Sequence, residues 1–184
     1  MTSMPAFADA LSGASPSAHR ATLRVAYASA LLAVACVLGL VEASLPPIAV
    51  IPWLRIGLAN IAVVVALAVC GARIAAFVSG GRVVVVGLVT GTIASPVFAM
   101  AAAGAALSLA VMVLLARALP PLSPIGLSAA GSAAHVVGQF TAAGLMLGTT
   151  SILVLAPPSV LVALALGAAT GLVAGGVVSR ITRR

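Results

Sequence analysis

The residues of this chain that could do chemistry are few, and they lie within apolar stretches. Glu42 is one of two acidic residues, and Asp9 is the other. Arg82 lies near the middle of an apolar segment that we expect over residues 74–91. A charge at mid-membrane costs about 3 kcal/mol or more and normally faces the protein interior. Arg82 is therefore either an anion-binding group or counter-ion, or a structural partner of Glu42 or of helix-end carbonyls.

His135 and Gln139 are spaced i, i+4, so they share one face of a helix. Such a pair could hydrogen-bond a substrate or join two helices. A metal site is not expected, because His19 lies in the N-terminal segment and no second ligand is near His135 in sequence. We expect no cofactor.

Prolines interrupt the apolar pattern between residues 46 and 52, where a continuous helix cannot form. Trp53, Arg55 and Asn60 follow in the same stretch. Irregular backbone beside membrane spans survives where protein or a watery cavity satisfies it, so we expect the wall or lid of a substrate pocket here. Trp53 is either a stacking platform or an interfacial anchor. Asn60 either lines the pocket or caps a broken helix.

The composition identifies an integral membrane protein. The 184 residues are 63% hydrophobic and 6% charged, with a mean hydropathy of +1.32. Soluble domains carry about 25% charged residues. Since a spanning helix needs about 20 apolar residues, the chain has room for about six spans and for no separate catalytic domain. The net charge of +7 comes from scattered arginines, not from a basic patch, so we expect no nucleic-acid partner.

The apolar runs predict an all-α bundle of six transmembrane helices that forms a single domain over residues 20–184. A flexible cytoplasmic tail is expected over residues 1–19. The expected spans cover approximately residues 25–41, 56–70, 74–91, 97–116, 125–147 and 159–178.

Arginine placement predicts the orientation of this bundle. Seven arginines lie at one set of helix ends, and the other set has only Arg55; the seven are Arg20, Arg24, Arg73, Arg117, Arg180, Arg183 and Arg184. By the positive-inside rule, both termini are cytoplasmic in a multi-pass protein of the cell membrane. The 42–56 stretch then lies on the outer face, where substrate would enter an importer.

Small residues recur at helical spacing and predict close helix packing. Gly167, Gly171 and Gly175 form GxxxGxxxG on the last span, and Ala26 and Ala30 form AxxxA near the start of the first. Such faces let helices approach closely, either inside the bundle or against a partner helix.

Together these residues resemble the signature of the Gx transporter family, E-x-x-[IL]-P-x-P…K-x-G-L-A-N-I. The matching stretch runs from Glu42 through the prolines to Arg55-Ile56-Gly57-Leu58-Ala59-Asn60-Ile61, and the likeness extends over about residues 24–180. Arg82 and Ala134-His135-x-x-Gly138-Gln139 match two further landmarks. Two residues depart from the pattern: Arg55 replaces a lysine, and Val136 stands where asparagine is common.

The resemblance implies a fold and a function. The family is similar to the S components of energy-coupling factor transporters, which are six-helix proteins that capture micronutrients. If Glu42 pairs with one of Arg55 and Arg82, one positive charge remains, which suits an anionic substrate. The residues that we expect to bind this small substrate are Glu42, Trp53, Arg55, Asn60, Arg82, His135 and Gln139. The resemblance also implies a transmembrane coupling subunit, faced by the Ala26 and Ala30 end of the first helix, and two cytoplasmic ATPases. The chain has no GxxxxGK[ST] loop of its own.

Members of the family are also labelled heptaprenyl diphosphate synthase component I. Prenyl transferases hold magnesium and diphosphate with several carboxylates, and this chain has only Asp9 and Glu42. We therefore expect no enzyme activity. A non-catalytic membrane partner of a prenyl diphosphate synthase, in isoprenoid or quinone metabolism, stays open as an alternative. A scaffold without a ligand is a third interpretation.

Overall fold

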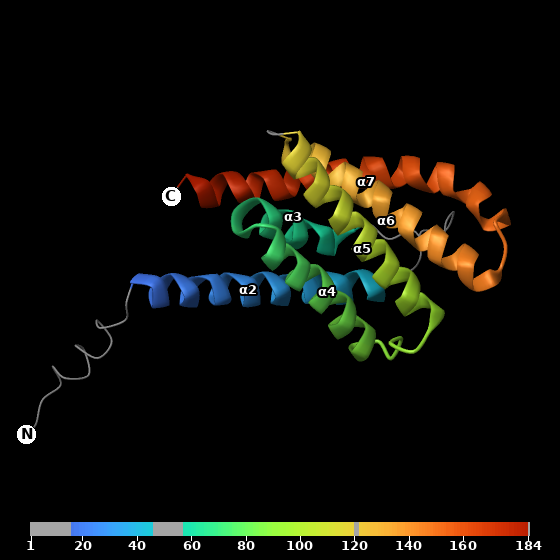
Figure 1. Ribbon diagram of the computed structural model, residues 1–184, viewed down its shortest axis with the longest axis horizontal. Coiled ribbons are helices and arrows are strands. Elements are labelled where there is room, and N and C mark those ends of the chain that lie inside the picture. The colour runs from blue at the N-terminus through green and yellow to red at the C-terminus, as the bar shows by residue number, and fades with distance from the viewer. Residues whose placement is uncertain (1–15, 46–56, 120–121, 184) are drawn as a thin grey trace, which may run out of the picture.

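The computed structural model describes residues 16–45, 57–119 and 122–183, and within these ranges the chain is helical, with no strand (Figure 1). The elements are α2 (Pro16–Ser44), α3 (Leu58–Cys70), α4 (Ala72–Val89), α5 (Pro96–Ala118), α6 (Pro124–Leu147), the 3₁₀ turn η1 (Ser151–Leu155) and α7 (Ala156–Thr182). The predicted all-α, six-helix architecture is therefore confirmed. The first helix begins at Pro16, inside the segment predicted as a tail.

The six described helices run alternately in opposite directions, so the start of α2 and the end of α7 lie at the same end of the bundle (Figure 1). Four segments are long and apolar enough to cross a membrane: Thr22–Ser44, Ala72–Val89, Pro96–Ala118 and Ser151–Thr182. They identify a membrane protein. The apolar α3 is shorter, at 13 residues, and α6 carries a row of polar side chains that lowers its hydropathy.

The short helix α3 forms the centre of the bundle. It packs against α2, α4, α6 and α7. Five consecutive residues, Ala62 to Ala66, are buried, which is the pattern of a helix enclosed on all sides. Around them lie buried apolar side chains of other helices, including Val78 and Met112. Because α3 is enclosed by longer helices, it does not need the length of an isolated span.

Two helices begin with the same local signal, a serine followed by proline. The Ser95 side chain accepts a hydrogen bond from the Phe98 amide, and the Ser123 side chain accepts one from the Gly126 amide. Proline occupies the next position in both cases. A capping serine satisfies an amide that the helix leaves open, and proline is tolerated there because it has no amide to satisfy.

Glycines let α6 approach both of its main neighbours. A Cβ at Gly167 would lie 2.8 Å from the Ala129 Cα, and one at Gly171 would lie 2.6 Å from the Ile125 Cα. These two members of the GxxxGxxxG face therefore pack inside the bundle, on α6; Gly175 lies beside Pro124. Ala26 and Ala30, in contrast, are exposed on α2.

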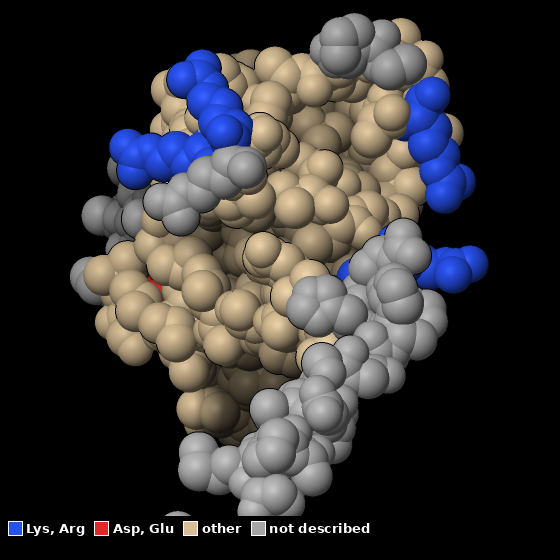
Figure 2. Space-filling view, turned by 90° about the vertical axis from the view of Figure 1, so that its left-hand side faces the viewer, with Lys and Arg blue, Asp and Glu red and all other residues tan. Residues whose placement is uncertain are grey.

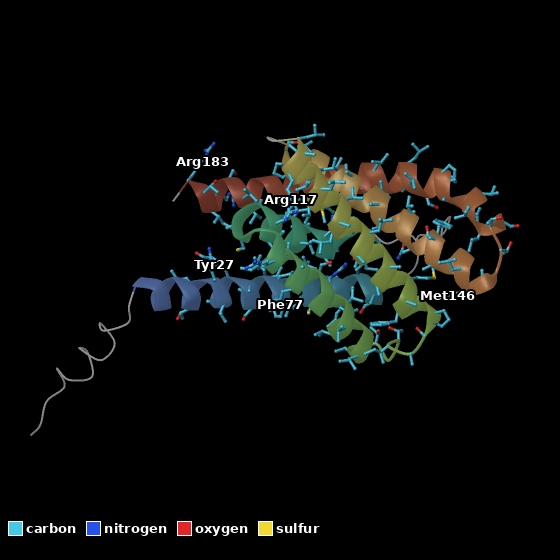
Figure 3. The ribbon with its side chains drawn as sticks, viewed as in Figure 1. Tyr27, Phe77, Arg117, Met146 and Arg183 are labelled. Carbon is cyan, nitrogen blue, oxygen red and sulfur yellow. The ribbon has the colours of Figure 1, made fainter. Side chains whose placement is uncertain are left out.

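Arginines gather at the end of the bundle that holds the termini. Arg24 lies near the start of α2, Arg73 in the first turn of α4, Arg117 in the last turn of α5 and Arg180 in the last turn of α7. In Figure 3, Arg183 lies at this end, and Met146 lies toward the other. Figure 2, which views this end, shows the basic side chains spread around its rim without forming one patch.

Candidate functional site

A cavity of about 560 Å³ opens in the half of the bundle away from the termini. All six helices line it: the end of α2, the start of α3, the second half of α4, the first half of α5, the middle of α6 and the first half of α7. Five residues that the sequence singled out line this one space, namely Glu42, Asn60, Arg82, His135 and Gln139. Trp53 and Arg55 lie outside the described residues.

Glu42 and Gly57 join the end of α2 to the start of α3. The Gly57 amide donates a hydrogen bond to Glu42 Oε1, and the glutamate is only 7% exposed. A charged acceptor makes such a bond stronger than a neutral one. Gly57 has φ 79°, in the left-handed region, and directly precedes α3. Glu42 therefore fixes the start of the helix that carries Asn60, as well as lining the cavity.

Replacing Gly57 with alanine is expected to destabilise the protein by about 1 kcal/mol through backbone strain, because L-residues other than glycine are disfavoured at positive φ. Among the described residues, an added Cβ would approach Ser132 Oγ at 4.0 Å, which is an ordinary van der Waals contact. Thermal unfolding in detergent would measure the loss. The matched control is Gly80→Ala, inside α4, where an added Cβ would meet no described atom of another element within 4 Å. Equal melting temperatures for the two variants would contradict the prediction.

Asn60 begins a chain of polar contacts through the interior. Its Nδ2 donates to Ser128 Oγ at 3.4 Å, and Ser128 Oγ lies 3.1 Å from Thr170 Oγ1. The Thr170 hydroxyl in turn donates to the Gly167 carbonyl at 3.1 Å. Ser128 and Thr170 are buried. Hydrogen bonds of this kind join helices in the membrane, so this series of hydrogen bonds fixes α3 against α6 and α7.

Arg82 brings a positive charge to the cavity from α4. Its side chain packs toward α2, where the Arg82 Cγ lies 3.8 Å from the position of a Cβ at Gly39, and its Nε atom is buried. Among the described residues of the lining, Arg82 and Glu42 are the charged ones. The described part of the lining therefore holds one residue of each sign, at positions contributed by two neighbouring helices.

His135 and Gln139 reach the cavity from α6 at a place where α5 and α6 cross closely. A Cβ at Gly104 would lie 2.8 Å from the His135 carbonyl oxygen and 3.0 Å from Gln139 Cγ. A Cβ at Gly138 would lie 2.8 Å from the Ala103 carbonyl oxygen. The two glycines thus set the depth at which the polar pair lies.

Sequence reasoning missed the hydroxyl groups of the lining. Ser132 joins the cavity from α6 and Ser108 from α5, while Thr90 and Thr92 border it where α4 ends. One signal was present in the sequence: Ser128, Ser132, His135 and Gln139 are spaced by four, three and four residues, which places all of them on one face of α6.

The polar lining is rich in hydrogen-bond donors. Arg82 has only donors, Asn60 and Gln139 each have an amide NH₂, and Glu42 has only acceptors when ionised. The remaining surface is largely apolar, with Val83, Val86, Phe98 and Leu166 among its members. A cavity of this size, mostly apolar with a few convergent polar groups, is typical of a small-molecule site. Its donors suit a ligand that presents several acceptor oxygens.

Comparison with known proteins assigns the chain to a family. Residues 31–177 match the family model described as heptaprenyl diphosphate synthase component I, and this match covers most of the chain, so the protein belongs to that family. No curated protein and no solved structure matches the chain.

Proposed function

We propose that this member of the family is the substrate-binding membrane subunit of an energy-coupling-factor-type importer, which captures a small anionic micronutrient or metabolite. The observation that carries the proposal is the convergence of Glu42, Asn60, Arg82, His135 and Gln139 on one cavity lined by all six helices. A purely structural bundle has no need to bring polar side chains from four helices to a single space, because each one adds a desolvation cost inside a membrane.

The arrangement of charge supports uptake from outside. The cavity lies in the half of the bundle opposite the arginine-bearing end, and the positive-inside rule assigns that end to the cytoplasm. In this orientation, within the cell membrane, the pocket faces the outer side. The proposed partners are a transmembrane coupling subunit and cytoplasmic ATPases, because the chain has no phosphate-binding loop to use ATP itself.

The test is mass spectrometry of small molecules that the protein retains after mild purification from its native membrane. We expect a retained anionic compound in the wild type and a reduced amount in a cavity variant, Asn60→Leu. The control is Thr141→Leu, an exposed position on α6 outside the cavity. If the wild type and Asn60→Leu retain the same compounds in the same amounts, the proposal that this cavity captures the substrate is wrong.

The family description favours a second candidate, a non-catalytic membrane partner of a prenyl diphosphate synthase. The shortage of carboxylates argues against catalysis by the chain itself, since only Asp9 and Glu42 could hold magnesium. Co-purification separates the two candidates. A coupling subunit with ATPases in the purified complex supports the importer, whereas a soluble prenyl synthase in their place supports the second candidate.

A further inference from the structure

A second cavity adjoins the first on the outer half of the α5–α6 pair. It measures about 360 Å³ and is lined by side chains of α5, α6 and η1, among them Pro96, Phe140, Ala143, Met146 and Ile152. Gln139 is its only strongly polar side chain among the described lining residues. The space is therefore suited to hydrocarbon, and it lies beside a cavity that is suited to acceptor oxygens.

The two cavities meet at a shared wall. Met100 of α5 and Gln139 of α6 line both of them. Methionine is unbranched and flexible, so it is well suited to adjust around a ligand that passes from one space to the next. The amide of Gln139 is at the junction, where it could donate to the polar part of such a ligand while the apolar part lies beyond it.

We infer that the ligand of this protein is an amphiphile, with an anionic, oxygen-rich head in the larger cavity and an apolar chain in the smaller one. The inference rests on the proposed capture function and adds the substrate class. A cavity with several convergent polar groups lies beside one that is almost wholly apolar, and Met100 and Gln139 line both, so the pair matches the two ends of one molecule. A fully polar metabolite would leave the apolar space unused, and a plain hydrocarbon would present no acceptor oxygen to the polar side chains of the larger cavity.

A matched set of probes tests this with the full-length protein in phosphatidylcholine nanodiscs. Methyl phosphate has the anionic head group alone. 1-Octanol has the eight-carbon apolar chain without an anion, and octyl phosphate has both the anionic head group and the apolar chain. Bound probe is quantified by mass spectrometry after washing, and retention by empty nanodiscs is subtracted. Because each buried methylene favours binding, we expect octyl phosphate to be retained about tenfold or more above methyl phosphate at equal free concentration.

Variants of the smaller cavity test where the apolar chain of the ligand binds. Met146→Ser places a hydroxyl in the apolar cavity at a position that is 47% exposed, so folding should tolerate it. Its control is Leu145→Ser, at a neighbouring position that is 80% exposed and outside both cavities. Ala143→Phe, which fills the smaller cavity, is paired with Ala106→Phe at an exposed position on α5. We expect Met146→Ser and Ala143→Phe to lower octyl phosphate retention about threefold or more, with methyl phosphate retention unchanged in both.

Each alternative result identifies which proposal fails. Equal retention of methyl and octyl phosphate would overturn the amphiphile, while the capture function would stand if methyl phosphate retention still falls in Arg82→Gln. Retention of 1-octanol as strong as that of octyl phosphate would also overturn the inference, because the smaller cavity would then be an ordinary lipid site. Failure of both phosphates to bind above empty nanodiscs would contradict the inference and the proposed anionic substrate together.

Discussion

Arg82→Gln is expected to lower the amount of small molecule retained by the purified protein about tenfold or more. The guanidinium is the positive charge among the described residues that line the cavity, and its Nε is buried. A hydrogen bond to a charged group contributes about 1.5–3 kcal/mol, which corresponds to about a 10- to 150-fold change in affinity. Glutamine keeps an amide NH₂ near the position of the arginine Nε but is two atoms shorter, so the variant removes the charge together with the terminal donors of the guanidinium.

The control lies on the same helix. Arg73→Gln removes the same charge from the first turn of α4, at an exposed position outside the cavity, and is expected to leave retention unchanged. Arg82→Lys is the control for a folding defect, because it keeps the positive charge but loses the planar guanidinium that can donate two parallel hydrogen bonds. We expect this variant to retain an intermediate amount of ligand. If Arg82→Gln is folded and retains as much ligand as Arg73→Gln, Arg82 is a structural counter-ion and the anionic substrate class is wrong.

The helices were predictable because their ends carry local signals. Gly71 separates α3 from α4, and the Ser95-Pro96 and Ser123-Pro124 pairs begin α5 and α6. Each signal acts on the backbone within a few residues, through conformational freedom at glycine or through capping at serine. Apolar runs between such signals therefore predict spans from sequence alone.

Neighbour relations could not be predicted in the same way. A helix that is apolar on every side gives no indication of which face meets which partner. The central position of α3, enclosed by α2, α4, α6 and α7, is a property of the whole bundle. The same holds for the smaller apolar cavity, whose lining from α5, α6 and η1 has no distinguishing residue type in sequence.

The charged and amide residues of the site were predictable for an energetic reason. A polar side chain within a span is costly unless it faces protein or water, and this cost alone directs Glu42, Arg82 and Gln139 to the interior of the bundle. Serine is less informative, because its hydroxyl can bond the preceding turn of its own helix and so tolerate any face. Ser128 was missed for this reason, although it connects Asn60 to Thr170.

Gly171→Leu is expected to destabilise the bundle by about 3 kcal/mol, the largest stability loss we predict. The contact that it disturbs is between backbones: a Cβ at Gly171 would lie 2.6 Å from the Ile125 Cα and 2.9 Å from the Pro124 carbonyl oxygen. Backbone atoms cannot rotate away as a side chain can, so α7 must move away from α6. Overpacking a closely packed interior costs about 1–3 kcal/mol and occasionally more.

The separation of α6 and α7 should also reach the cavity. Thr170 precedes Gly171 and bonds Ser128, which bonds Asn60, so displacing α7 breaks this chain of contacts. The matched control is Gly176→Leu on the same helix, at an exposed position where an added Cβ would meet no atom of the other described elements within 4 Å. Thermal unfolding in nanodiscs, together with ligand retention, compares the two. If Gly171→Leu and Gly176→Leu have the same melting temperature, the contact between α6 and α7 is looser than the structure shows. The hydrogen bonds from Thr170 through Ser128 would then not hold Asn60 in place.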